Sequence, residues 1–310
     1  MTAGKQRAIP RESLLMRLFR STGMDSIAWP LRRLHCPVEA NDLVLEVGSG
    51  GNPYYRANVL CDAYLETYER HYAALVNDRP TVLAYVENLP FRDDAFEFCI
   101  ASHVLEHSPD PEKFLSEIQR VAKAGYIEVP DAFMERLCPY PMHKLEIADE
   151  NGVLVISGKK GPAQDEELCR LFGRKASVRF PQWISRFPFD FHVRYYWDKA
   201  AGGIAHRVEV PELAATWEAP EAERKLPRLG FAARIKSCLL RAARKFLSQR
   251  RRNGSIDILD LVRCNRCMSG RLEKRGDRAV CVACSAEFPV LNAAIIDFTA
   301  EQPPVRGETA

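Results

Sequence analysis

The stretch VLEVGSGGNP, residues 44–53, sets an apolar run directly before a glycine-rich turn and holds one carboxylate, Glu46. Glycine lets the backbone turn sharply and approach a ligand closely, but a G-x-G-G pattern alone is a weak signal. Glu46 would repel a pyrophosphate, and Pro53 removes a backbone donor where a phosphate-binding helix would begin. The turn therefore favours a cationic ligand over a dinucleotide.

Strand-like and helix-like segments alternate around this turn. The strand-like runs are residues 42–47, 58–61, 81–86, 95–102 and 126–130, and a helix-like run covers residues 111–124 and ends at Gly125. This alternation predicts an α/β fold with a doubly wound, mostly parallel sheet. Ligands of such sheets lie beyond the carboxyl ends of the strands.

Two stretches of this region resemble the class I S-adenosylmethionine-dependent methyltransferases, in particular the type 11 family, across roughly residues 43–130. VLEVGSG is similar to the first motif of the family, and residues 87–121, ENLPFRDDAFEFCIASHVLEHSPDPEKFLSEIQRV, are similar to its third and fourth region. The resemblance implies a Rossmann-like fold, methyltransferase activity and S-adenosyl-L-methionine as cofactor. The sulfonium and ammonium groups of that cofactor suit a turn that carries a carboxylate.

The resemblance also implies how the turn meets the cofactor. Gly48 and Gly50, with Ser49 between them, are expected to pass under its amino-acid end. Glu46 is expected to act on that end through water or through the backbone of the turn.

A second acid is expected at the tip of the second strand, where it would accept hydrogen bonds from the ribose hydroxyls. Asp62 is the natural candidate, and Glu66 is the alternative. Because Asp62 follows Gly48 by only 14 residues, the helix between them is expected to shrink to one or two turns.

The third strand departs from the family pattern. Members commonly carry Gly-Asp-Ala before Leu-Pro-Phe, and the Asp holds the adenine amino group, whereas this chain has Tyr85 at that position. Glu87 could replace the missing acid, Tyr85 could stack on the ring, and the backbone of Val86 could address its edge.

Polar residues gather after the fourth strand, near the expected position of the transferred methyl group: Ser102, His103, Glu106 and His107. Their spacing allows packing or cofactor contact, general base catalysis or metal binding, and the resemblance favours the first. If the acceptor is a hydroxyl, His103 is the candidate base, with His143 and His192 as alternatives.

Four cysteines near the carboxyl end form two C-x-x-C pairs, separated by thirteen residues. They are Cys264, Cys267, Cys281 and Cys284. Two such pairs close a tetrahedral S4 site suited to a structural zinc ion, because four thiolates leave no open position. Residues 261–298 resemble the small zinc-ribbon family that includes methyltransferase activator subunits, which suggests a scaffold or a substrate-docking module.

Hairpin signals dominate the chain after Pro130. Residues 143–160 place Asn151-Gly152 between two strand-like runs, and residues 189–210 suggest a second hairpin, so that one could complete the sheet and the other form a cap. The aromatic-rich residues 180–197 are either a satellite core or a wall of the substrate site.

Composition and charge describe an ordinary globular chain of 310 residues, 46% of them apolar. No apolar run approaches the length of a membrane span, and the start lacks a secretory signal, so we expect a cytoplasmic protein. Residues 224–252 hold 11 of the 44 Lys and Arg residues and no acid. This basic amphipathic segment could be a solvated linker, a membrane-surface contact or a nucleic-acid contact.

The sequence therefore predicts six segments. They are an N-terminal helical segment (1–40), a cofactor-binding core (41–130), a hairpin-rich sheet completion and substrate cap (131–222), a basic helix (223–255), a zinc ribbon (256–300) and a disordered tail (301–310). The predicted activity is O-methylation of a saccharide or another small acceptor, lipid-linked acceptors included. An RNA methyltransferase that docks its substrate on the ribbon and a non-catalytic binding protein are the alternatives.

Overall fold

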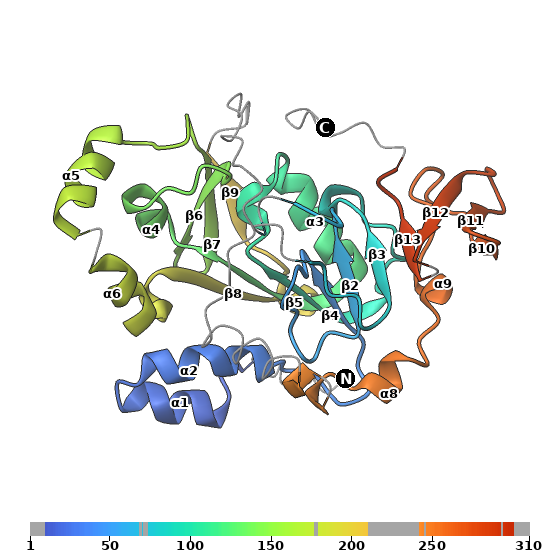
Figure 1. Ribbon diagram of the computed structural model, residues 1–310, viewed down its shortest axis with the longest axis horizontal. Helices are drawn as coiled ribbons and strands as arrows, with labels where there is room; N and C mark the ends of the chain where they lie inside the picture. Colours follow the sequence, from blue (N-terminus) through green and yellow to red (C-terminus); the bar gives the residue numbers. More distant parts are fainter. Residues whose placement is uncertain are drawn as a thin grey trace, which may run out of the picture.

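A ten-stranded, mostly parallel sheet organises the protein. The computed structural model describes residues 10–67, 70, 74–176, 179–209, 242–244, 246–292 and 294–300. In spatial order the strands are β10 (Leu272–Arg275), β11 (Arg278–Cys281), β12 (Glu287–Leu291), β13 (Ile295–Asp297), β3 (Thr81–Leu83), β2 (Val59–Asp62), β1 (Val44–Val47), β4 (Phe96–Ser102), β5 (Ala122–Pro130) and β8 (His192–Asp198). Figure 1 shows β10–β13 at one end of this sheet and β8 toward the other.

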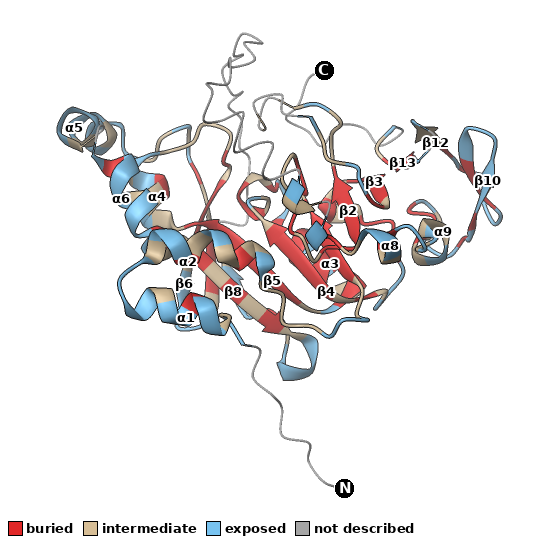
Figure 2. Ribbon diagram, turned by 60° about the horizontal axis from the view of Figure 1, so that its bottom comes forward, coloured by how far each residue is buried: buried red, intermediate tan, exposed pale blue. Residues whose placement is uncertain are grey.

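The five parallel strands β3-β2-β1-β4-β5 confirm the predicted α/β sheet. Their residues are mostly apolar because both faces are covered, and β1, β2 and β3 are buried at every position, Glu46 and Asp62 included. Figure 2 shows β4 and β5 mostly in the colour of buried residues. The sheet places the ends of β1, β2 and β4 at one edge, where the predicted site residues lie.

One helix of the core ends earlier than its sequence predicts. Helix α3 covers Pro111–Val121, and Ala122 already begins β5, where it pairs with Phe96 of β4. Lys123 and Ala124 are good helix formers, but the pairing of β5 with β4 outweighs that local preference. The helix therefore does not extend to Gly125.

The first predicted hairpin is present and the second is not. β6 (Leu145–Glu150) and β7 (Val153–Gly158) are antiparallel around Asn151-Gly152, both with positive φ, as a type I′ turn requires. By contrast, β8 pairs with β5 in the large sheet, whereas β9 (His206–Val208) pairs with β7 in a separate three-stranded sheet. The second hairpin prediction was wrong because residues 189–210 divide between two sheets.

The aromatic stretch divides between the main hydrophobic core, which contains Tyr195 and Trp197, and a smaller cluster around Phe180. Tyr195 and Trp197 are buried on one face of β8, and Phe180 contacts Phe191 with ring centroids 5.2 Å apart. Trp183 alone among these keeps about half of its surface, 52%, exposed. The α-helices of the chain between β5 and β8 are α4 (Ala132–Leu137), α5 (Glu166–Ala176) and α6 (Phe180–Arg186).

The described part of the predicted N-terminal segment contains two short α-helices, α1 (Leu14–Ser21) and α2 (Asp25–Leu31), followed by the 3-10 turn η1 (Arg32–Leu34). Ser13 caps α1 by accepting the N–H of Met16. Among the described residues, no helix is long and apolar enough to cross a membrane.

The cysteine-bearing strands β10–β13 are continuous with the large sheet. β13 pairs in parallel with β3, with Ile296 opposite Val82, and so covers what would otherwise be a sheet edge. Phe288 and Phe298 belong to the same buried cluster as the core strands. The predicted ribbon therefore shares both sheet and core with residues 41–130.

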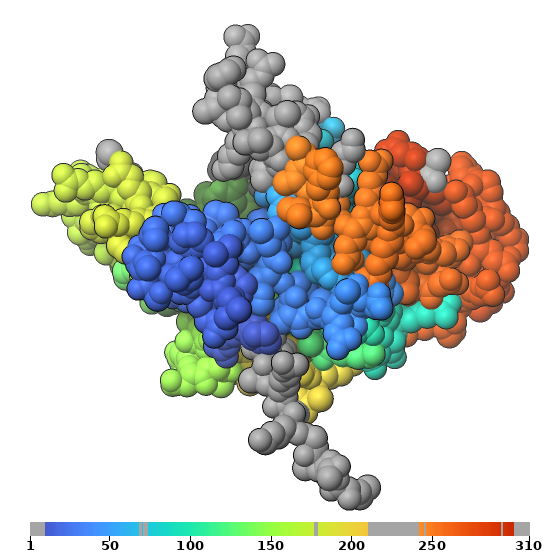
Figure 3. All heavy atoms as spheres, turned by 90° about the horizontal axis from the view of Figure 1, so that it is seen from below, coloured from blue at the N-terminus to red at the C-terminus, as the bar shows by residue number. Residues whose placement is uncertain are grey.

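The basic segment lies largely outside the described residues, as does the predicted tail 301–310. Its described end includes α8 (Arg250–Asn253), followed by α9 (Ile258–Leu261). Arg244 donates to the Gly51 carbonyl at 3.1 Å, and Arg252 donates to the Asp42 carbonyl at 2.9 Å. Figure 3 shows this end, in orange, on the surface between the blue N-terminal part and the red ribbon, so these two arginines bind the body of the protein.

Candidate functional site

The glycine turn follows β1 directly and adopts a conformation that favours glycine. Gly48 and Gly50 have φ of +63° and +56°. A Cβ at Gly48 would lie 2.1 Å from Cγ2 of Val104, so the turn packs tightly against the loop after β4. The tight turn that the sequence predicts is present, and only glycine fits its first position.

Glu46 supports this turn from within the sheet. Its side chain is buried, and Oε2 accepts the N–H of Tyr54 at 2.7 Å, just beyond Pro53. Burial raises the pKa of Glu46 to about 8, although the charge of Arg33 and the hydrogen bond from Tyr54 act in the opposite direction. Glu46 therefore contacts the backbone beside the turn, and its expected action on the cofactor stays a prediction. A carboxyl with this pKa is largely uncharged at neutral pH, so it does not supply the fixed negative charge that the sequence argument assumed.

Asp62 lies at the end of β2 and contacts the turn. Oδ2 accepts the N–H of Gly50 at 2.9 Å, and Oδ1 forms an ion pair with Arg70 at 2.7 Å. Residues 48–58 contain turns and no helix, so the predicted short helix is absent from that described stretch. A ribose hydroxyl would have to share Oδ1 with Arg70 or displace it, whereas the alternative acid, Glu66, is exposed.

The region predicted to hold adenine is aromatic on one side and acidic on the other. The Tyr85 ring meets the Tyr64 ring edge-on at 6.0 Å, and the buried Val86 begins a 3-10 turn. Glu87 accepts the hydroxyl of Ser108 at 2.5 Å, and burial raises its pKa. All three substitutes that the sequence suggested for the missing Asp, Tyr85, Val86 and Glu87, therefore lie just after the end of β3.

Ser49 supplies an unsatisfied polar group at the centre of the turn. Its hydroxyl is buried and has no hydrogen-bond partner among the described residues. A buried polar atom without a partner is uncommon in native structures and marks a place for a ligand or a water. The glycine turn, Ser49 and Asp62 together fit a cofactor that carries ammonium and hydroxyl groups.

His103 follows β4 in a left-handed conformation, with φ of +58°, and non-glycine residues in that region cluster at functional sites. Its ring lies between two buried carboxylates, with Nδ1 3.4 Å from Glu106 and Nε2 3.6 Å from Glu128. The His103 side chain is 38% exposed, so a buried pair of acids orients an accessible imidazole.

Glu106 stays ionised within this group. Burial alone would raise its pKa, but the neighbouring His103, followed by the charges of His107 and His143, holds the pKa below its usual range.

Glu128 and Arg32 complete the site and were missed from the sequence. Arg32 binds both oxygens of Glu128, at 2.7 and 3.0 Å, and Ser102 donates to the same carboxylate at 2.9 Å. Burial opposes ionisation, but the Arg32 charge and hydrogen bonds hold the pKa of Glu128 at about 2. An acid inside the apolar run YIEVP was the available signal, the same signal that singled out Glu46.

The two alternative bases also lie here. The His192 ring is 5.4 Å from the His103 ring, and burial lowers its pKa. The His143 ring meets the His107 ring at 4.8 Å. The structure thus brings all three predicted base candidates to the end of β4.

The four cysteines form one cluster. The Sγ atoms of Cys264 and Cys284 are 3.7 Å apart, and those of Cys267 and Cys281 are 3.6 Å apart. Four sulfurs at about 2.3 Å from a tetrahedral zinc ion would lie roughly 3.8 Å apart. The donor set and its spacing fit the predicted structural zinc.

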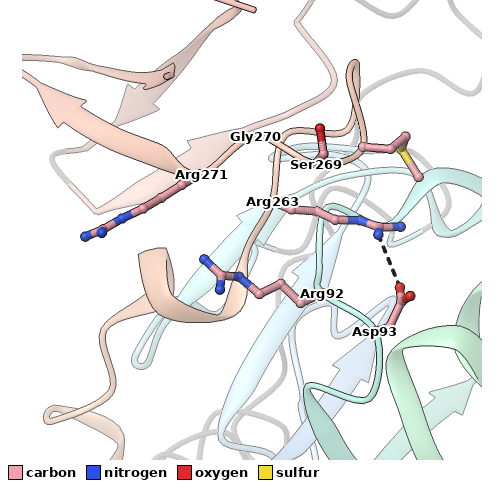
Figure 4. A pocket seen from close by; sticks show the side chains of 7 residues that line it. Arg92, Asp93, Arg263, Ser269, Gly270 and Arg271 are labelled. Atoms are coloured by element: carbon pink, nitrogen blue, oxygen red, sulfur yellow. Dashed lines mark ion pairs between the residues drawn. The ribbon is translucent and has the colours of Figure 1, made fainter. Parts of the chain in front are cut away.

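A hollow of about 380 Å³ lies where the ribbon meets the sheet. It is lined by Arg92, Asp93, Arg263, Met268, Ser269, Gly270 and Arg271. Figure 4 shows Arg263 directed at Asp93, an ion pair of 3.2 Å, whereas the guanidinium of Arg92 points away from that pair. The hollow is therefore cationic on balance.

Comparison with known families identifies the region around the glycine turn. Residues 45–127 match the Methyltransferase domain family. The match runs from β1 into β5, so it contains the turn, Asp62 and His103, and it confirms the predicted resemblance over this part of the chain. With the sheet order, it gives the Rossmann-like fold of class I methyltransferases.

Two curated relatives illustrate how far the similarity extends. An uncharacterized methyltransferase of Mycobacterium leprae is 34% identical over 131 residues, which cover 36% of this chain and 46% of that protein. An uncharacterized protein of Methanocaldococcus jannaschii is 41% identical over 44 residues, or 14% of this chain and 22% of that protein. The chain spans less than half the length of these relatives.

Solved structures are similar at low identity. A chain of the complex between the Haloferax volcanii Trm112 methyltransferase activator and a methyltransferase is 17% identical, with a TM-score of 0.33, over 61% of this chain and 94% of that chain. The YcgJ protein of Bacillus subtilis is 18% identical, with a TM-score of 0.28, over 52% of this chain and 82% of that chain.

Proposed function

We propose that this protein transfers the methyl group of S-adenosyl-L-methionine to an oxygen of a saccharide or another small acceptor, lipid-linked acceptors included. The observation that carries the proposal is His103, held at positive φ between Glu106 and Glu128 beside a turn of the methyltransferase domain. An oxygen acceptor must lose a proton, and an accessible imidazole oriented by carboxylates is suited to take it.

The chain's own residues would hold the cofactor by its polar groups. The turn Gly48–Gly50 and the hydroxyl of Ser49 would bind the amino-acid end, and Asp62 would accept the ribose hydroxyls. The cofactor supplies a methyl group on a sulfonium, which transfers by in-line displacement. Because placement supplies much of the rate of such a reaction, the rigid turn and His103 are the principal contributions of the protein.

The cofactor-binding part is tested by calorimetric titration of S-adenosyl-L-methionine. We expect Gly48→Ala to abolish the heat of binding, since a Cβ there meets Val104 at 2.1 Å. Gly276→Ala is the matched control, because Gly276 has nearly the same φ, +64°, but nothing within 4 Å of its Cβ position. An absence of heat with the wild-type protein would favour the non-catalytic alternative.

The catalytic part is tested by His103→Gln with an acceptor panel of saccharides. General base catalysis is worth about 10²–10⁴-fold, so we expect turnover to fall by that order while cofactor affinity stays within twofold. Unchanged turnover in His103→Gln would remove the base role and leave packing or cofactor contact for this residue.

A second candidate is methylation of RNA, with the ribbon as docking module. The arginines of the hollow beside the ribbon, Arg92, Arg263 and Arg271, favour it, since arginine clusters bind phosphate. RNA affinity that falls steeply with salt and weakens in Arg271→Ala would support this candidate. Affinity that Arg271→Ala leaves unchanged would favour the small acceptor.

The cytoplasmic location and a membrane contact through the basic segment stay predictions. Residues 223–241 of that segment lie outside the described residues, and Arg244 and Arg252 bind backbone carbonyls of the body. Vesicle association that depends on residues 224–241 would support a membrane contact.

A further inference from the structure

A second group of potential metal ligands lies beside His103, away from the cysteines. Glu106 and His107 belong to the 3-10 turn after β4, and His143 precedes β6. One ligand atom from each lies within 4.8 Å of the others. Two imidazoles and one carboxylate are a donor set that suits zinc and other divalent first-row metals.

The two ligands that face each other stand too far apart for a hydrogen bond. Nε2 of His143 is 4.0 Å from Oε1 of Glu106. Two ligand atoms bound to one tetrahedral ion at about 2.1 Å would lie roughly 3.4 Å apart. These two ligand atoms would therefore need to approach by only about 0.6 Å, whereas His107 is placed only to within 4.8 Å of the other ligands.

Glu106 is the independent sign of a missing ligand. Its side chain is only 2% exposed. Neither carboxylate oxygen has a hydrogen-bond partner among the described residues, although His103 Nδ1 lies 3.4 Å from Oε1. A buried charge without hydrogen bonds is costly unless it is paired or bound to a metal. A cation at this position would satisfy it.

The surroundings of His143 match those of a metal-bound histidine. Nδ1 lies 2.7 Å from Glu135, which in turn binds Lys159 at 2.6 Å. Metal-ligating histidines commonly donate their second ring N–H to a carboxylate, which fixes the ring and leaves the other nitrogen free to coordinate. Because Lys159 balances the charge of Glu135, Glu106 is the carboxylate left to neutralise a metal.

We propose that Glu106, His107 and His143 form a second metal site that binds zinc or a similar divalent ion, separate from the four-cysteine site. Three protein ligands leave at least one coordination position for water or an acceptor oxygen, unlike the closed S4 cluster. Binding at this site does not depend on methyl transfer, so the proposal can be tested apart from the activity.

The test is metal stoichiometry of the full chain after equilibration with zinc and removal of free ion. We expect two zinc ions per wild-type chain, one in Glu106→Gln and one in His143→Ala. His206→Ala is the matched control: His206 also pairs with an acid, Glu112, at 2.7 Å, but lies in β9, and this variant should keep two ions.

Cobalt substitution identifies which site is lost. The S4 site gives intense thiolate-to-cobalt charge-transfer bands, whereas a site of nitrogen and oxygen ligands gives only weak visible bands. In Glu106→Gln the charge-transfer bands should persist and the weak bands should disappear, with the far-ultraviolet circular dichroism unchanged. One zinc ion in the wild-type chain, or two in Glu106→Gln, would overturn the proposal.

Discussion

Two buried glutamates occupy apolar strands of the same sheet and have opposite ionisation behaviour. Glu46 on β1 has a pKa raised to about 8 by burial, whereas the Arg32 guanidinium holds the pKa of Glu128 on β5 at about 2. Glu46 accepts one backbone N–H, but Glu128 receives Arg32 in a bidentate pair. The same pattern of one acid in a run of apolar residues thus produces two different groups. Glu46 is a largely uncharged carboxyl that supports the turn, whereas Glu128 is a permanent negative charge beside His103.

Removing the partner of Glu128 should have the largest effect. Arg32→Met removes the arginine counter-charge of the buried Glu128 carboxylate, and breaking a buried pair in this way costs about 3–5 kcal/mol. We expect that loss in the free energy of unfolding from urea denaturation at pH 7. The variant should also perturb His103, because Glu128 lies 3.6 Å from its ring.

The double variant Arg32→Met/Glu128→Leu is the control for this change. It removes both charges and should recover most of the stability, since a buried pair replaced by apolar residues is often neutral overall. If the single variant loses less than about 1 kcal/mol, Glu128 does not depend on Arg32 for its charge.

The pH dependence of stability should differ between the two acids. The folded pKa of Glu46 lies above its ordinary value of 4.5, so the folded state binds more protons between pH 4.5 and 8. Stability from Glu46 is therefore present at low pH and lost as the pH rises toward 8. Each pH unit is worth up to about 1.4 kcal/mol, which gives a loss of up to roughly 2 kcal/mol between pH 6 and 7.5.

Glu46→Gln should flatten that slope, because glutamine keeps the shape of the neutral acid and does not titrate. Glu128→Gln should keep the slope between pH 6 and 7.5, since stability from Glu128 is present above pH 4.5 and is lost as the pH falls through about 2. Urea unfolding of both variants at the two pH values makes the comparison. If stability still falls between pH 6 and 7.5 in Glu46→Gln, the pH dependence belongs to another titrating group.

Local pattern predicted the parts of this molecule that local chemistry determines. The strand–turn VLEVGSG, the Asn151-Gly152 hairpin and the spacing of the cysteine pairs each specify a structure within a few residues, and all three are present. The position of His103 followed from its place directly after β4.

The pairing of strands that are distant in the sequence could not be predicted from such local patterns. Nothing in residues 189–210 shows that β8 pairs with β5 and β9 pairs with β7. The alternation of apolar and polar residues would equally allow β8 and β9 to pair with each other. The docking of β13 on β3 likewise depends on a contact more than 200 residues distant in sequence. The Glu106–His107–His143 group requires the 3-10 turn η4 (Leu105–His107) and the loop before β6 to meet, which no spacing along the chain indicates.

The smallest effects are expected from alanine substitutions of two serines that follow the strands carrying the two glutamates or their neighbours, Ser49 after β1 and Ser102 at the end of β4. Ser102 donates to Glu128 at 2.9 Å, whereas Ser49, in the turn above Glu46, has a buried hydroxyl without a partner among the described residues. Ser102→Ala should lose about 1.5 kcal/mol of stability, because its hydrogen bond goes to a charged group. Ser49→Ala should leave stability unchanged but weaken S-adenosyl-L-methionine binding about fivefold, the equivalent of ~1 kcal/mol. Equal affinity of the two variants for the cofactor in calorimetry would show that the Ser49 hydroxyl is satisfied by water and does not contact the cofactor.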